Sequence, residues 1–183
     1  MTATSIGPEA LSRPAGLGRR VAALLYELLL LVAIVFAAGF LLLPLVTPGR
    51  AGAAAALTVP ALPERVALFC LLFGIMAAYF VWCWSNGRRT LPMKTWRLRL
   101  VLTDGHPVPV KVALARYLAT WIGPVLALGA YAVLQPYGFG AHAAWLVAFN
   151  FLCAFVDPER QFLHDRIAGT RIIVAGPSPI VRR

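Results

Sequence analysis

The chain has 183 residues, of which 60% are apolar and only 13% are charged, and its mean hydropathy is +0.77. A water-soluble domain averages about 45–50% apolar and about 25% charged residues, so this composition excludes a disordered chain and argues against a soluble globule. The net charge of +10 fits either a nucleic-acid-binding protein or a membrane protein with basic loops, and the positions of the charges decide between them.

Four apolar segments follow one another along the chain, and they predict membrane spans at about 20–44, 65–85, 116–135 and 139–156. A helix needs about 20 residues to cross about 30 Å of hydrocarbon. The fourth segment is the shortest, and a re-entrant or buried segment is the alternative for it. We predict an all-α membrane protein with a four-helix transmembrane bundle over 20–174, preceded by a tail at 1–19 and followed by one at 175–183.

The bases lie almost entirely on one side of this topology. Fifteen of the 17 Lys and Arg residues fall before the first span, between the second and third, or after the fourth. By the positive-inside rule both termini are then cytoplasmic, and the protein is a multi-pass protein of the inner (cell) membrane. Bases that flank hydrocarbon spans do not form a soluble nucleic-acid-binding face. The expected partners are the bilayer and the anionic lipids of its cytoplasmic side, without nucleic acid.

Two short strands and a helix are expected on the cytoplasmic side. Residues 96–102 alternate at period two before the turn signal Asp104-Gly105, and 170–174 are rich in β-branched residues. We predict that these two segments pair at the membrane surface. Asp157 followed by proline fits a helix start and Gly169 fits a helix end, which predicts a short interfacial helix over about 158–168.

Glu27 is the most informative single residue. A carboxylate near the middle of a membrane costs about 2.5–3.5 kcal/mol on insertion scales, and the residues three and four positions away on its own helix offer no hydrogen-bond donor. Counting depth from the span ends predicts a polar cluster of Glu27, Tyr79 and Asn150 that opens toward Arg20 and Arg116. Two interpretations remain open: an ion or proton site, or an interhelical hydrogen bond worth about 0.6–2 kcal/mol.

Motifs for catalysis or metal binding are lacking in the sequence. There is no glycine-rich phosphate loop after a strand and no nucleophile elbow, and the three cysteines and three histidines are scattered. We therefore predict no catalytic residue, no metal site, no cofactor and no enzymatic activity. His164 and Asp165 are adjacent on the predicted tail helix and point about 100° apart, so they form no acid–base pair, and we expect a solvated or arginine-paired face.

Three segments together resemble the RDD family of small bacterial membrane proteins. They are RVAALLYE at 20–27, GRRTLPMKTWRL at 87–98 and QFLHDRIAGT at 161–170, and the resemblance extends from about residue 13 to 174. The family is named for one arginine and two aspartates, which the resemblance assigns to Arg20, Glu27 and Asp165. Glutamate at 27 is one methylene longer than the family's aspartate, and Pro92 stands where a glycine is usual.

The resemblance implies a role in transport, including sodium/proton exchange for some members. We therefore expect a contribution to ion (proton or sodium) or small-solute transport, with Glu27 as the ion-facing group, Arg20 as its counter-charge, and Tyr79 and Asn150 as the polar shell. Four spans are few for a self-contained carrier, so a second copy or a membrane partner is expected. The alternative is a non-transporting assembly or regulatory protein that binds lipid heads or a partner through its basic cytoplasmic face.

Overall fold

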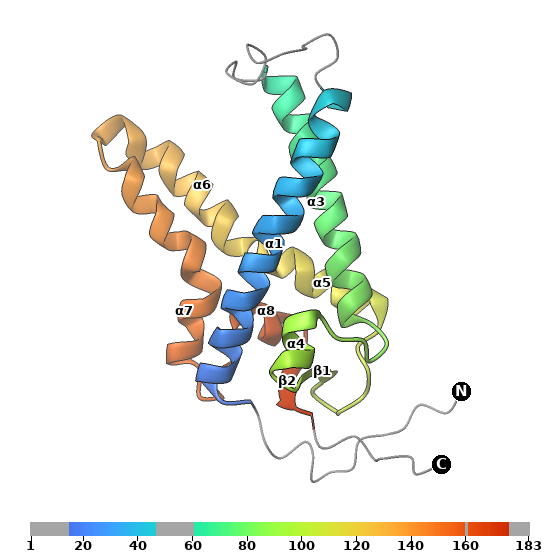
Figure 1. Ribbon diagram of the computed structural model, residues 1–183. Helices are drawn as coiled ribbons and strands as arrows, with labels where there is room; N and C mark the ends of the chain where they lie inside the picture. Colours follow the sequence, from blue (N-terminus) through green and yellow to red (C-terminus); the bar gives the residue numbers. More distant parts are fainter. Residues whose placement is uncertain (1–14, 47–60, 160, 176–183) are drawn as a thin grey trace.

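The computed structural model describes residues 15–46, 61–159 and 161–175, and these are mostly helical (Figure 1). Three helices are long and apolar enough to cross a membrane. They are α1 (Leu17–Val46), α3 (Leu62–Trp84), and the continuous stretch Val110–Tyr137, which contains α5 (Val110–Thr120), α6 (Ile122–Leu134) and the 3₁₀ turn η2 (Gln135–Tyr137).

The fourth apolar segment differs from the other three. It begins as a 3₁₀ helix, η3 (Gly140–Ala148), and continues as α7 (Phe149–Val156), and it falls short of the length of the other spans. The predicted four-helix bundle is therefore not confirmed: the described residues hold three candidate spans and one shorter apolar helix. A 3₁₀ helix rises about 2.0 Å per residue against about 1.5 Å in an α-helix, so the 3₁₀ portion lengthens this segment.

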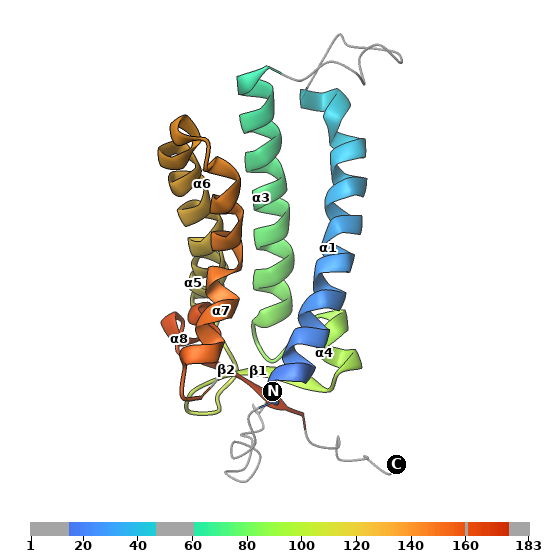
Figure 2. The same cartoon turned by 90° about the vertical axis from the view of Figure 1, so that its left-hand side faces the viewer.

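The helices form two pairs that diverge instead of closing into a bundle. α1 packs along α3, and η3 packs along α6. α5 packs against α3 and so joins the pairs at one end, while the other ends separate (Figure 1); Figure 2 shows the same helices side by side from a view turned by 90°. α6 and η3 approach each other closely because Gly123 has no side chain: a Cβ there would lie 2.6 Å from the carbonyl oxygen of Val147.

A break between α5 and α6 is tied to α7 by Asn150. Pro124 has no N–H to donate to the carbonyl of Thr120, four residues earlier, and Trp121 bonds instead in the 3₁₀ manner to Leu118. The Asn150 amide donates to the freed Thr120 oxygen at 2.7 Å and to the Ala119 oxygen at 3.1 Å. A buried amide thus satisfies the Thr120 carbonyl that the proline leaves open and also bonds to the neighbouring Ala119 carbonyl.

A small sheet and two short helices lie at the end where the helix pairs meet (Figure 1), which we call the sheet end. It comprises α4 (Leu91–Thr95), β1 (Leu98–Leu102), α8 (Leu163–Ile167) and β2 (Thr170–Val174). β1 and β2 are antiparallel, with Leu100 opposite Ile172, which confirms the predicted pairing. The strand begins two residues later than predicted, because Trp96 ends α4 and Arg97 has a left-handed backbone (φ 52°).

The interfacial helix is shorter than the predicted 158–168. The Asp157 carboxylate accepts hydrogen bonds from the backbone N–H groups of Glu159 and Gln161, so it stabilises a turn instead of starting a helix. The helix begins only at Leu163 and ends before Gly169, whose φ of +62° gives the helix end that the sequence predicted.

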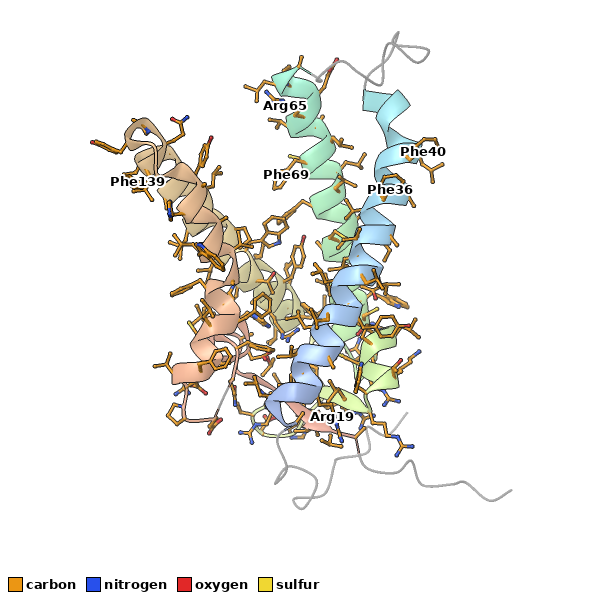
Figure 3. All side chains as sticks on the ribbon, turned by 60° about the vertical axis from the view of Figure 1, so that its left-hand side comes forward. Arg19, Phe36, Phe40, Arg65, Phe69 and Phe139 are labelled. Carbon is orange, nitrogen blue, oxygen red and sulfur yellow. The ribbon has the colours of Figure 1, made fainter. Side chains whose placement is uncertain are left out.

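The two ends of the molecule differ in what their side chains contact. The sheet end holds the largest fully buried apolar side chains, which are Leu98, Leu100, Val101 and Ile173. The halves of α1 and α3 away from the sheet expose large apolar side chains instead, including Phe36, Phe40 and Phe69, and Arg19 and Arg65 mark the opposite ends of these helices (Figure 3).

Candidate functional site

A cavity of about 750 Å³ lies between α1 and α3 on one side and α5, α7 and α8 on the other. Most of its lining is apolar. Its charged and polar lining includes Arg20, Glu27, Arg116, Thr120 and His164. The cavity therefore brings together side chains from three helices that are far apart in sequence.

α1 supplies two of these residues through the spacing seen in the sequence. Arg20 and Glu27 are seven residues apart, which is two helical turns, so they share a face and are separated by about 10 Å along the axis. Arg20 is buried and donates to the backbone oxygen of Ile172 in β2 at 3.5 Å. It also lies within electrostatic range of Asp165 and Asp157.

Glu27 finds its partner in the segment that follows α3 instead of in another span. The Thr90 hydroxyl is placed to donate to the Glu27 carboxylate, and Arg116 lies within electrostatic range of it. Thr90 is positioned because it caps α4, accepting from the Met93 N–H at 3.3 Å. The Oε1 atom of Glu27 is buried and has no hydrogen-bond partner among the described residues.

The floor of the cavity rests on a buried ion pair between α5 and α8. Asp165 Oδ1 lies 2.6 Å from Arg116 Nη2 and 2.8 Å from Nε, and the side chains are only 1% and 3% exposed. The guanidinium also lies over the Trp84 ring, 4.1 Å from its centroid. Burial alone would raise the pKa of Asp165, but the attraction of the Arg116 and Arg20 guanidinium groups outweighs it and holds the pKa below its usual range.

His164 is a neutral part of this floor. Its Nε2 is 3.9 Å from Asp165 Oδ1, too far for a hydrogen bond, and its ring stacks on Phe162 at 5.6 Å. Burial lowers the pKa of His164 to about 4, so the imidazole is uncharged near neutral pH. Of the two environments predicted for this dipeptide, Asp165 has the arginine-paired one.

The other predicted residues lie outside the cavity lining. Tyr79 is half-buried on α3 beside Phe80 and within electrostatic range of Glu27. Asn150 is buried, and its amide bonds to the carbonyls at the break between α5 and α6. The structure therefore brings Arg20, Glu27 and Arg116 to one cavity, with Asp165 directly behind Arg116.

Two residues of the site were missed by sequence reasoning. Thr90, which bonds to Glu27, carries a recognisable signal, because a threonine followed within two residues by proline is typical of a helix start. Trp84, which lies under Arg116, looks from the sequence like an interface anchor. Only the fold reveals that it faces a charged partner from another helix.

The polar atoms at the cavity suit a charged ligand without suggesting a metal centre. Arg116 Nη1 and Trp84 Nε1 are buried donors without an acceptor, and Glu27 Oε1 is a buried acceptor without a donor, among the residues described. Within the same residues no group of three or more His, Cys, Asp or Glu side chains is placed to hold a metal ion.

Comparison with known proteins supports the resemblance carried by the three sequence segments. No curated protein and no solved structure shows significant similarity to the chain. The model of the RDD family, however, matches residues 14–169, a range that includes Arg20, Glu27 and Asp165. Because this match covers well over half of the sequence, the chain belongs to the RDD family.

Proposed function

We propose that this integral membrane protein contributes to the transport of an ion, a proton or sodium, or of a small solute, with Glu27 as the group that binds it. One observation carries the proposal: a carboxylate on a candidate span lines a cavity and keeps one buried oxygen without a hydrogen-bond partner among the described residues. Acids within membrane spans are costly, and they commonly mark ion pathways.

The charges around Glu27 suit a carboxylate that binds and releases a proton or an ion. Arg116 attracts the ionised Glu27, and Asp165 competes for the same guanidinium. An ion or proton on Glu27 would weaken the first attraction and leave the second unchanged. Arg20, on the same face of α1, is then the counter-charge nearer the sheet end, and Tyr79 is the polar neighbour from α3. Asn150 would act by holding α7 to α5.

The distribution of exposed bases supports a cytoplasmic sheet end in the bacterial inner membrane. Arg19, Lys94, Arg97 and Lys111 are exposed at or near the sheet end, whereas Arg65 lies at the opposite end of α3 (Figure 3). Cytoplasmic loops carry an excess of Lys and Arg. With the fourth apolar segment crossing as well, α1 begins and β2 ends on the cytoplasmic side.

Reconstitution into liposomes tests the transport proposal. We expect purified protein to produce a proton or sodium flux, measured with an entrapped fluorescent indicator, and Glu27→Gln to abolish it. Glu64→Gln is the matched control, because Glu64 lies in the first turn of α3, at the far end of that helix, and its cap on the Ala61 N–H suits glutamine as well. Absence of flux from the wild type, or full flux from a folded Glu27→Gln protein, would overturn the proposal.

The exposed bases also favour a second candidate function. A non-transporting assembly or regulatory protein would use the basic stretches of its sequence, residues 86–116 and the C-terminal tail, to bind anionic lipid heads or another protein. It predicts no flux and a partner that copurifies at fixed stoichiometry. Size-exclusion chromatography with light scattering then distinguishes a second copy of the chain from a different membrane protein.

A further inference from the structure

The cavity has one polar end and one apolar end, and the apolar end is open. Toward the sheet end its lining includes Arg20, Arg116 and His164. Away from the sheet the lining continues along α1 and α3 with large apolar residues that are exposed on the outside of the protein. These are Leu28 and Val32, together with Phe36 and Phe69, of which the two phenylalanines are labelled in Figure 3. Because these helices are candidate spans, the apolar end of the cavity opens to the hydrocarbon of the bilayer.

The polar end offers two directed donors. Arg116 uses Nε and Nη2 on Asp165, which leaves the buried Nη1 without an acceptor among the described residues. Trp84, whose ring lies under the same guanidinium, has a buried Nε1 that also lacks an acceptor among the described residues. Both residues line the cavity, and a buried N–H without an acceptor is costly, so this pair of donors suits a ligand with negatively charged oxygens.

The same end offers an acceptor of opposite charge. Glu27 lines the cavity within electrostatic range of Arg116, and its buried Oε1 has no donor among the described residues. The polar end thus offers donors on Arg116 and Trp84 and an acceptor on Glu27, and a head group that carries both a negative and a positive charge can use both.

We propose that the cavity binds one membrane phospholipid whose head group combines a phosphate with a primary ammonium. The phosphate accepts from Arg116 Nη1 and Trp84 Nε1, and the ammonium donates to Glu27. One acyl chain follows α1 past Leu28 and Val32 toward the open apolar end. The volume of about 750 Å³ lies within the range of about 300–1,000 Å³ found for small-molecule sites. This proposal does not depend on ion transport.

Binding of three lysophospholipids with the same acyl chain tests the head-group assignment. We would titrate lysophosphatidylethanolamine, lysophosphatidylcholine and lysophosphatidylglycerol against the full chain in an uncharged detergent and follow bound lipid by native mass spectrometry. The choline head lacks N–H donors, and the glycerol head lacks the positive charge. We expect the ethanolamine lipid to bind about tenfold more tightly than either. Equal affinities, or a preference for choline or glycerol, would overturn the proposal.

Two substitutions separate the contacts to the ammonium and to the phosphate. Glu27→Gln should remove the preference for ethanolamine over glycerol. Trp84→Phe keeps an aromatic ring under Arg116 but removes the N–H, so it should weaken all three lipids to a similar degree. Retention of the ethanolamine preference by Glu27→Gln would contradict the assignment. Loss of flux and loss of lipid preference are measured separately, so one proposal can fail while the other stands.

A matched pair of tryptophan substitutions tests whether the lipid occupies the cavity. Leu28 lines it, whereas the adjacent Leu29 does not, and both side chains are exposed, so neither substitution disturbs the core. We expect Leu28→Trp to reduce binding of the ethanolamine lipid about tenfold and Leu29→Trp to leave it unchanged. Equal effects would exclude the cavity as the site. If the protein is a dimer that dissociates in Leu28→Trp but not in Leu29→Trp, the cavity is an interface between copies of the chain, and the lipid-binding proposal is overturned.

Discussion

The sheet end and the outer halves of the long helices are both rich in apolar side chains, yet they are held in different ways. At the sheet end Leu100 is 1% exposed and packs within a protein core, whereas on α1 Leu29 is 69% exposed. In a bilayer Leu29 contacts lipid tails that are as apolar as itself, so its burial among helices is not what stabilises the fold. Hydropathy therefore identifies both regions as apolar but does not show which of them stabilises the folded protein.

The contacts that hold the helices together also differ between the two regions. The sheet end holds a buried ion pair and the short sheet, whereas farther along α6 and η3 are held by close backbone approach at Gly123, and α7 is tied to α5 by the Asn150 amide. We therefore expect substitutions to be most damaging at the sheet end, smaller at the helix contacts, and smallest on the lipid-facing surface.

The largest effect is expected from Asp165→Ala. It leaves the Arg116 guanidinium buried without its carboxylate, and removal of one partner of a buried pair typically costs about 3–5 kcal/mol. The measurement is the free energy of unfolding in mixed detergent micelles. The double variant Arg116→Met with Asp165→Leu removes both charges and should recover much of the loss. If Asp165→Ala unfolds like the wild type, the ion pair does not hold the sheet end.

The comparison of the two regions is tested directly by one substitution in each. Leu100→Ala removes a buried side chain opposite Ile172 and should destabilise the protein by about 2–5 kcal/mol. Leu29→Ala, on the lipid-facing side of α1, should change stability by a few tenths of a kcal/mol at most, about the size of an ordinary surface substitution. Comparable losses in the two variants would show that α1 is covered by protein there.

The strand pairing was predictable because the sequence carries it locally. Alternation over 98–102, the β-branched run over 170–174 and the Asp104-Gly105 turn all point to short strands. The divergence of the helix pairs was not predictable in this way. It is accompanied by a 3₁₀ segment at Gly140–Ala148 and by a break at Trp121 between α5 and α6, and neither changes the apolar pattern by which spans are recognised.

Only the part of the site that lies on a single helix was predictable from the sequence. The seven-residue spacing of Arg20 and Glu27 places both on one face of α1, and both line the cavity. The partner of Asp165 is 49 residues away on α5, and the Thr90 bond to Glu27 depends on how α4 packs against α1. Depth counting assumes that polar residues at one depth face each other, and Asn150 instead faces the backbone of α5.

The buried imidazole makes the sheet end sensitive to acid. The pKa of His164 is about 4 in the folded protein because of burial, against about 6.5 when unfolded. The unfolded chain therefore binds a proton first, and stability is lost as the pH falls from about 6.5 to about 4, by up to about 3 kcal/mol. His164→Phe, which retains a ring beside Phe162, should flatten this part of the pH–stability curve. An unchanged slope in that variant would assign it to another group.

An intermediate loss is expected at the contact between the two helices of the second pair. Gly123→Ala would place a Cβ 2.6 Å from the Val147 oxygen, and because the obstacle is backbone, α6 and η3 must separate. Overpacking of this kind costs about 1–3 kcal/mol. Gly129→Ala is the matched control on the same helix, since a Cβ there meets nothing within 4 Å. Both variants gain the same helix propensity from alanine, so the difference between their unfolding free energies isolates the contact. If the two variants unfold alike, α6 and η3 are held by the buried amide and the turn instead of by close backbone approach.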